Sequence, residues 1–227
     1  MKILSWNCCL PPWALTRGRR LPKIVLTALD SEPDIICLQE VFFKSDAQKI
    51  VELLSSHGFV DSYHFKDLLT VSKFPLLDKK GQQYRSQGGL FSLAVLDAAY
   101  GKGFQIVKFM DGDTLTFLAN THLLSAWAVA TPGLQHIREQ QAHEVCQSMT
   151  QLPEGEKIIL GDFNFQPKTL PYQEFTKMNF KDDTNDQKTT TRRTIDYVML
   201  NNNPLRKAEI ASFNTALSDH AALVAVI

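Results

Sequence analysis

The residues of this chain that could do chemistry stand at or beside the ends of predicted strands. In the segment 158–164, three apolar residues and Gly161 lead into Asp162, Phe163 and Asn164. If the backbone stays extended there, Asp162 and Asn164 point to the same side, while Phe163 turns into packing. The alternative is an Asp/Asn turn that caps the following segment. The same arrangement recurs along the chain, and the polar candidates are Asn7, Glu40, His122, Asp162, Asn164, Asp196, Asp219 and His220.

These side chains suit one kind of chemistry. A carboxylate such as Asp196, set between Ile195 and Tyr197, is costly to bury unless a cation or hydrogen-bond donors meet it. Oxygen ligands without cysteine fit a hard cation such as Mg²⁺, with Mn²⁺ as a substitute. Histidines act as acid and base near neutral pH, and an asparagine stabilises charge on phosphoryl oxygens. This set indicates metal-assisted attack of water on a phosphate ester.

The hydrophobic pattern predicts the elements that must hold these residues. Residues 1–60 indicate strand–helix–strand–helix, with Pro22 in the first turn of one helix and Ser45 as the N-cap of the next, which Gly58 ends. No linker divides the chain, so we expect a single domain of the α/β class, with two packed sheets and helices outside. The expected strands are residues 3–6, 34–40, 68–71, 89–95, 104–109, 114–120, 195–200 and 221–227, and the later helices are residues 135–149 and 167–178.

Composition narrows the class of protein. The chain has 227 residues, 44% of them hydrophobic and 21% charged, and no run approaches the ~18 apolar residues of a membrane span. Lys+Arg and Asp+Glu balance at 24 each, which argues against a dedicated nucleic-acid binder, and the basic clusters at 17–23 and 192–193 are interpreted as solvated surface. With no signal peptide and no zinc-type cysteine spacing, we expect a cytoplasmic monomer with reduced thiols.

Six short motifs in order along the chain carry a resemblance to a known family. Together they resemble the endonuclease/exonuclease/phosphatase superfamily, which has the deoxyribonuclease-I-like fold. The resemblance runs nearly end to end and implies a four-layer α/β/β/α sandwich of two mixed sheets over residues 1–227. It also implies Mg²⁺-dependent cleavage of a phosphodiester or phosphomonoester. The motifs are Trp6-Asn7, Leu38-Gln39-Glu40, Asn120-Thr121-His122-Leu123, Gly161-Asp162-Phe163-Asn164, Ile195-Asp196-Tyr197 and Ser218-Asp219-His220.

The resemblance implies a metal site built from three of the matched residues. Glu40 would bind the Mg²⁺ ion, and Asn7 would support it. Asp219 would lie beside the ion or contact it through water.

The resemblance implies an acid–base role for the other matched residues. His220 would be the general base that activates water, and Asp196 would orient it. Asp162 would position the nucleophile or the leaving group, and Asn164 would donate to the phosphate. His122 would bind the phosphate or help to protonate the leaving oxygen, but the sequence shows no orienting partner for it.

Within the superfamily, three stretches look most like the neutral sphingomyelinases, and they are residues 69–76, 100–104 and 10–12. The substrate implied is a phospholipid. The alternatives are a nuclease or a tyrosyl-DNA phosphodiesterase-like enzyme acting on nucleic acid, and a non-catalytic binding module that kept the fold. Two departures from the family pattern leave the substrate open: Asp67-Leu68 replaces a small pair, and Thr194 replaces an arginine.

Two apolar loops follow strand ends and are expected to flank the mouth of the site. One is residues 11–15 with Trp13, and the other is residues 126–132 with Trp127. One hypothesis is that they form an apolar rim for a lipid or a stacked base. The alternative is that both tryptophans pack under their loops.

Overall fold

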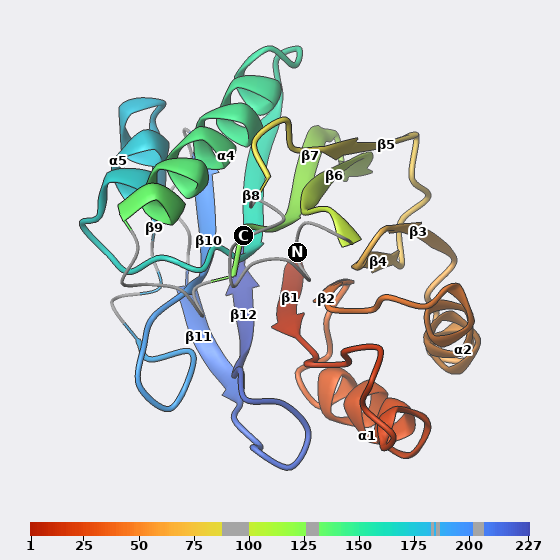
Figure 1. Ribbon diagram of the computed structural model, residues 1–227. Coiled ribbons are helices and arrows are strands. Elements are labelled where there is room, and N and C mark those ends of the chain that lie inside the picture. The colour runs from red at the N-terminus through yellow and green to blue at the C-terminus, as the bar shows by residue number, and fades with distance from the viewer. Residues whose placement is uncertain (88–99, 126–131, 183, 185–186, 202–206) are drawn as a thin grey trace.

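Two six-stranded mixed sheets lie face to face at the centre of the molecule, and helices cover their outer faces (Figure 1). The computed structural model describes residues 1–87, 100–125, 132–182, 184, 187–201 and 207–227. In this view the layers follow one another from α4 and α5, through the two sheets, to α1 and α2. The predicted four-layer α/β/β/α sandwich is therefore confirmed.

The first sheet combines both ends of the chain. Its strand order is β11-β12-β1-β2-β4-β3, in which β1 and β2 are parallel and the other pairs are antiparallel. The last two strands return to pair beside β1, so the sheets are not the two sequence halves. The bounds are β1 (Lys2–Asn7), β2 (Ile35–Gln39), β3 (Asp61–Phe65), β4 (Leu68–Ser72), β11 (Lys207–Ser212) and β12 (Ala222–Val226).

The second sheet has the order β5-β6-β7-β8-β10-β9, with β7 and β8 parallel and the other pairs antiparallel. Its edge strand β5 reads Asp-Lys-Lys-Gly-Gln-Gln, and such a charged edge escapes a search for apolar alternation. The strands β3, β9 and β11 were missed as well, and the expected strand 89–95 lies outside the described residues. The bounds are β5 (Asp78–Gln83), β6 (Gly103–Asp111), β7 (Thr114–His122), β8 (Glu156–Asp162), β9 (Phe180–Asp182) and β10 (Asp196–Asn201).

The described helices are α1 (Arg17–Leu29), α2 (Lys44–Ser55), α4 (Pro132–Thr150) and α5 (Leu170–Lys177). Two predicted helix starts were wrong. Pro22 lies inside α1, which begins earlier because Arg17 is anchored to Asp46 by a 3.0 Å bond from its Nε. Ser45 is already helical, and Phe43 occupies the N-cap position of α2 without a side-chain bond. No helix in the described part of the chain is long and apolar enough to cross a membrane.

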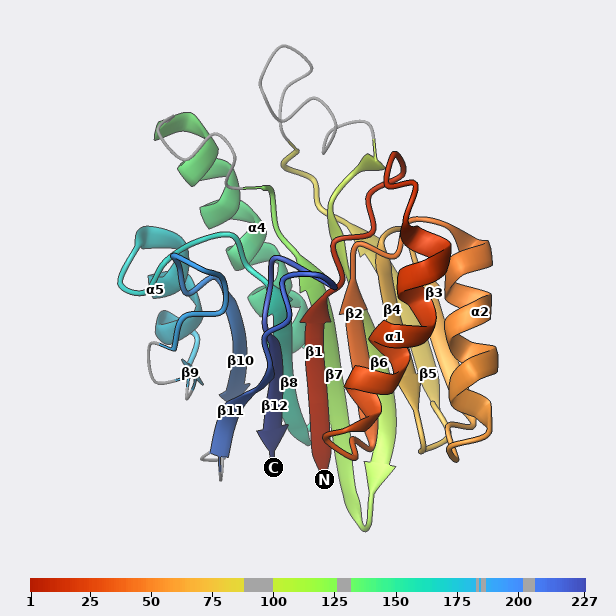
Figure 2. The same ribbon diagram turned by 90° about the horizontal axis from the view of Figure 1, so that it is seen from below.

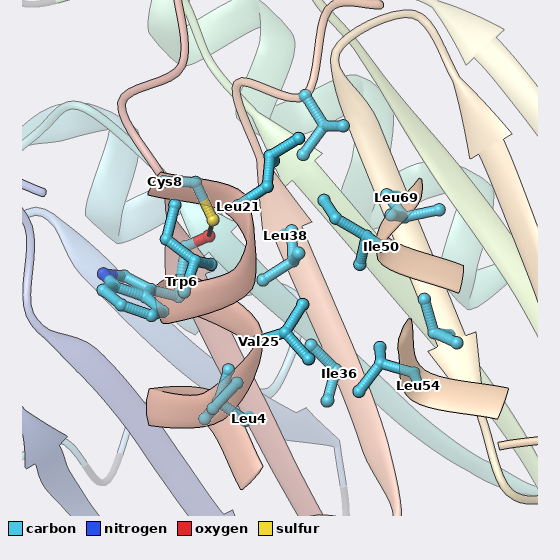
Figure 3. Packing of buried hydrophobic residues seen from close by; sticks show 14 of the residues in the cluster. Leu4, Trp6, Cys8, Leu21, Val25, Ile36, Leu38, Ile50, Leu54 and Leu69 are labelled. Carbon is cyan, nitrogen blue, oxygen red and sulfur yellow. Dashed lines mark hydrogen bonds between the residues drawn. The ribbon is translucent and has the colours of Figure 1, made fainter. Parts of the chain in front are cut away.

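Alternate strand residues fill different layers of the core. On β8, Ile158 and Leu160 belong to the cluster between the two sheets, whereas Ile159 belongs to the cluster under α4 and α5. A third cluster joins α1 and α2 to the first sheet and includes Leu4 and Trp6 of β1 and Ile36 and Leu38 of β2 (Figure 3). Strands buried on both faces read as continuous apolar runs, as the sequence showed.

Gly161 lets β8 run to Asp162, although the sequence predicted that this glycine ends the strand. Its φ is +139°, and a Cβ there would lie 1.9 Å from the carbonyl oxygen of Thr121 on β7.

We predict that Gly161→Ala destabilises the protein by about 3 kcal/mol or more, because backbone strain and a clash with main chain add together. The matched control is Gly112→Ala in an open turn with φ +58°, which should cost about 1 kcal/mol. Equal losses in chemical unfolding would contradict this account.

Candidate active site and metal centre

The candidate residues meet at one end of the seam between the two sheets. In the second sheet, His122 of β7 is the register partner of Asp162 of β8, which in turn is the partner of Asp196 of β10. In the first sheet, Asn7 ends β1 beside Gln39, and Glu40 follows directly. The strand directions thus place carboxylates and a histidine from separate segments in one row.

Asp162 and Asp196 form a pair of buried, directly opposed carboxylates. Each residue is 2% exposed, and like charges opposite each other on neighbouring strands destabilise a sheet. Ligand atoms of Asp162, Asp196 and His220 all lie within 4.8 Å of one another. Buried carboxylate oxygens that face one another fit a hard divalent cation, which would offset their repulsion. The chemistry of this donor set therefore fits a metal ion.

Asn7 links the first sheet to this carboxylate pair. Its Nδ2 donates to Oδ2 of Asp162 at 2.9 Å and to Oε1 of Glu40 at 3.1 Å, while its Oδ1 accepts from the Cys9 amide. Glu40 is half-buried, and its φ of 62° turns the chain back at the end of β2. The amide thus holds two carboxylates from different sheets close together.

His220 is paired with Asp196 across the seam. Its Nδ1 lies 3.0 and 2.9 Å from the two carboxylate oxygens of Asp196, and its Nε2 lies 3.7 Å from Oδ2 of Asp162. Burial alone would lower the pKa of His220, but the charges of Asp196 and Asp162 raise it to about 10. Burial and the charge of Asp162 also raise the pKa of Asp196. A cation beside these carboxylates would reduce their pull on the His220 proton.

Backbone contacts that the motifs did not reveal fix the position of His220. The hydroxyl of Ser218 donates to the carbonyl oxygen of Asn7 at 2.6 Å and accepts from the amide of His220 at 3.0 Å. The indole nitrogen of Trp6 donates to the carbonyl oxygen of His220 at 2.9 Å. Trp6 and Ser218, which belong to the Trp-Asn and Ser-Asp-His motifs, therefore hold the backbone of His220 in place.

The partners of His122, which the sequence did not identify, are Asp67 and Lys102. Its Nδ1 lies 2.8 Å from Oδ2 of Asp67, and Lys102 Nζ lies 2.9 Å from the same nitrogen. Burial and Lys102 lower the pKa of His122, but Asp67 outweighs them and the net shift is upward. Its Nε2 lies 3.5 Å from Oδ2 of Asp162. Two features of the sequence could have indicated these partners. Asp67 replaces a small residue of the family pattern, and Lys102 lies in the family-like stretch 100–104.

Two candidates stand differently from the expectation. Asn164 has a φ of 52°, and its amide donates to Oδ1 of Asp162 at 3.0 Å, so the extended geometry was wrong and the Asp/Asn turn is present. Its Nδ2 donates to the carbonyl oxygen of Leu123 at 3.2 Å.

Asp219 is exposed and lies outside the cluster of Asp162, Asp196 and His220. Asp219 lies near the thiol of Cys9. Burial raises the pKa of this thiol most, and the charges of Glu40 and Asp219 raise it further, to about 12.

The two tryptophan loops have different outcomes. Trp13 is 62% exposed, so the idea that it packs under its loop was wrong. Trp127 and most of its loop lie outside the described residues.

Comparison with known proteins decides the family. The family model described as the Endonuclease/Exonuclease/phosphatase family matches residues 4–220. The chain belongs to this family. It is 26% identical over 181 residues to a putative neutral sphingomyelinase of Drosophila melanogaster, and this match covers 76% of the chain and 41% of that protein.

A second relative is similar to the same extent. It is the inositol phosphosphingolipids phospholipase C of Schizosaccharomyces pombe, which is 26% identical over 196 residues, with 81% of this chain and 45% of that protein covered. The chain therefore spans less than half the length of these two relatives.

Solved structures agree on the fold. Beta toxin from Staphylococcus aureus superposes with a TM-score of 0.81 at 17% identity, covering 100% of this chain and 99% of that chain. Sphingomyelinase C from Streptomyces griseocarneus gives a TM-score of 0.74 at 15% identity, covering 99% and 98%. The predicted resemblance to this superfamily and to its sphingomyelinases is confirmed.

The opposed carboxylates predict that a divalent cation stabilises the protein. At a Mg²⁺ or Mn²⁺ concentration of ~100 times Kd, we expect the Tm to rise by roughly 5–10 °C, because such saturation stabilises the folded state by about 2.7 kcal/mol. Asp162→Asn should lose most of this shift. The exposed Asp113→Asn, in the turn between β6 and β7, should keep it. Equal shifts in the two variants, measured by calorimetry, would show that the ion binds elsewhere.

Proposed function

We propose that this chain is a divalent-cation-dependent phosphodiesterase that hydrolyses a phospholipid of the sphingomyelin class. The observation that carries the proposal is the buried, opposed pair of Asp162 and Asp196 with His220 against both of them. Two buried carboxylates need more positive charge than the single imidazolium of His220 supplies, which favours a bound cation over a purely structural role. The completeness of the cluster also argues against a non-catalytic module.

We propose Mg²⁺ as the ion, with Mn²⁺ as a substitute. Glu40, supported by Asn7, would hold it together with Asp162, and Asp219 would approach from the exposed side. When bound, the ion supplies positive charge that stabilises negative charge on the phosphoryl oxygens. One superposable beta toxin structure, with a TM-score of 0.78 at 17% identity, is described as having bound magnesium ions, which supports this choice.

The chain's own side chains would move the protons. Because Asp196 holds Nδ1 of His220, its Nε2 faces the carboxylate of Asp162. With its pKa lowered by a bound cation, this nitrogen would take a proton from attacking water. His122 is held in the same way by Asp67, so its Nε2 also faces Asp162. A proton on that nitrogen would bind a phosphate oxygen or pass to the leaving oxygen.

The other residue roles that the resemblance implies belong to the same proposal. Asp162, which lies between the two imidazoles, would orient the nucleophile or the leaving group, and Asn164 would donate to the phosphate. Residues 1–227 would act as one catalytic domain, because both sheets contribute to the site. The cytoplasmic location and the monomeric state stay predictions from the sequence.

The substrate class rests on the relatives. Both curated relatives are named for enzymes of phosphosphingolipids, whereas a structure of TDP2 superposes with a TM-score of 0.73 at 15% identity and covers 99% of this chain. A DNA-processing activity is therefore the second candidate. The equal numbers of basic and acidic residues favour the lipid.

One preparation tested on three substrates separates these possibilities. With Mg²⁺, we expect release of the phosphorylated headgroup from sphingomyelin at a rate about a hundredfold or more above cleavage of a phosphotyrosyl-DNA end. Bis-p-nitrophenyl phosphate, a small water-soluble diester, reports the chemistry without a lipid. Faster cleavage of the DNA end would favour the second candidate, and no turnover of any diester in Mg²⁺ or Mn²⁺ would favour the binding module.

The acid–base assignment predicts the effect of removing single side chains. His220→Ala and Glu40→Ala should each lower kcat on bis-p-nitrophenyl phosphate by about a thousandfold or more, with little change in the far-ultraviolet spectrum. His57→Ala, at an exposed histidine after α2, is the matched control and should keep full activity. Near-normal turnover in His220→Ala or Glu40→Ala would refute the role given to that residue.

A further inference from the structure

The loop between β1 and α1 exposes large apolar side chains at the site end of the molecule. Trp13 is 62% exposed, and Leu15, at 101%, is fully exposed. The loop begins at Asn7, a site residue, and Figure 2 shows it at the same end as the carboxyl end of β1. Apolar groups are therefore presented to water at the same end of the first sheet as Asn7.

Two arginines hold this loop in place. Arg20 donates to the carbonyl oxygens of Cys8 and Cys9 at 2.7 and 2.8 Å and also to that of Leu217. Arg17 donates to the carbonyl oxygen of Pro12 and to the carboxylate of Asp46. The loop backbone is thus clamped to the body of the protein.

Basic side chains flank the apolar tip. The helix α1 contains Arg17, Arg19, Arg20 and Lys23 and no acidic residue, although the whole chain is balanced in charge. Arg19 and Lys23 are exposed and lie one helical turn apart on one face. An apolar tip beside a basic helix face is typical of proteins that bind to anionic lipid surfaces.

A neighbouring loop extends this surface. Phe43, which follows β2, is 38% exposed and lies under the guanidinium of Arg17, at 4.4 Å from its ring centroid. The exposed Lys44 follows it. The aromatic and basic character therefore continues across two loops that both leave the site end of the first sheet.

We propose that Trp13, Leu15, Arg19 and Lys23 form a membrane wedge that inserts into the surface of an anionic phospholipid bilayer. The two apolar side chains enter the interface, and the two basic side chains contact the lipid headgroups. The wedge follows Asn7 at the site end of β1, so binding would bring this end of the molecule to the headgroup layer. Its use in catalysis rests on the function proposed above.

Vesicle binding tests the wedge directly. We expect the protein to co-sediment with vesicles of phosphatidylcholine and phosphatidylserine, and Trp13→Ala/Leu15→Ser should lower the partition coefficient by about tenfold or more. The matched control is Val60→Ser/Leu77→Ser, since these residues are 66% and 57% exposed but lie at the other end of the strands. The control should bind as the wild type does. Unchanged binding by the folded wedge variant would overturn the proposal.

Charge-reversal variants and tryptophan fluorescence test the membrane wedge independently of the apolar substitutions. Arg19→Glu/Lys23→Glu should weaken binding to phosphatidylserine-containing vesicles by about fivefold or more per charge, and binding to phosphatidylcholine alone should change little. Vesicles should shift the tryptophan emission of the wild type to shorter wavelength, and Trp13→Phe should lose that shift. Failure of the wild type to bind either kind of vesicle would overturn the proposal, as would Trp13-dependent binding to oligothymidylate without vesicle binding.

Hydrolysis of bis-p-nitrophenyl phosphate separates this inference from the proposed function. The wedge variant should keep wild-type turnover of this diester while it loses activity on sphingomyelin vesicles. Wedge-dependent vesicle binding in a protein that hydrolyses no diester would support the wedge and reject the enzyme. Equal loss of activity on both substrates in the wedge variant would overturn the assignment of these side chains to membrane binding.

Discussion

One carboxylate oxygen, Oδ2 of Asp162, lies at the centre of the candidate site and is approached from both sheets. It accepts from Asn7 Nδ2 at 2.9 Å, and it lies 3.5 Å from His122 Nε2 and 3.7 Å from His220 Nε2. These groups come from different segments and from both sheets. Because Asp162 is buried opposite Asp196, its charge has to be offset by positive charge brought from elsewhere. His122 and His220 supply part of that charge. A cation bound to the carboxylate oxygens would supply the rest.

The relative position of the sheets is set just behind the site. Between the sheets the core is apolar, but it gives way to a buried pair in which Gln39 Nε2 donates to Oδ1 of Asn120 at 2.8 Å. Gln39 directly precedes Glu40, and Asn120 lies on the same strand as His122. Nδ2 of Asn120 also donates to the carbonyl oxygens of Leu38 and Leu69 in the first sheet, both at 3.3 Å. A slip of one sheet on the other would leave these buried polar groups without partners, so the network specifies one alignment. The alignment of the carboxylates thus depends on an interaction between sheets that no single strand determines.

The sequence predicted more of the layers and the site than of the elements between them. Apolar runs such as 158–160 identified the buried strands, and the six motifs identified Glu40, Asp162, Asp196 and His220. Polar edge strands such as β5 carry no apolar alternation, and a helix start such as that of α1 depends on the distant Asp46. The partners of His122 were missed for the same reason. Asp67 reaches it only because the two sheets pack together, and Lys102 reaches it because β6 pairs with β7. Asn164 lies in an Asp/Asn turn and is also buried beside Asp162, so the turn and the place in the candidate site do not exclude each other.

We propose that a divalent cation joins Glu40 of the first sheet to Asp162 of the second. The most direct measurement is an anomalous difference map from crystals grown with Mn²⁺. The account predicts a peak within about 2.5 Å of carboxylate oxygens of both residues. A peak that contacts neither residue, or no peak near Asp162 at saturating Mn²⁺, would contradict it.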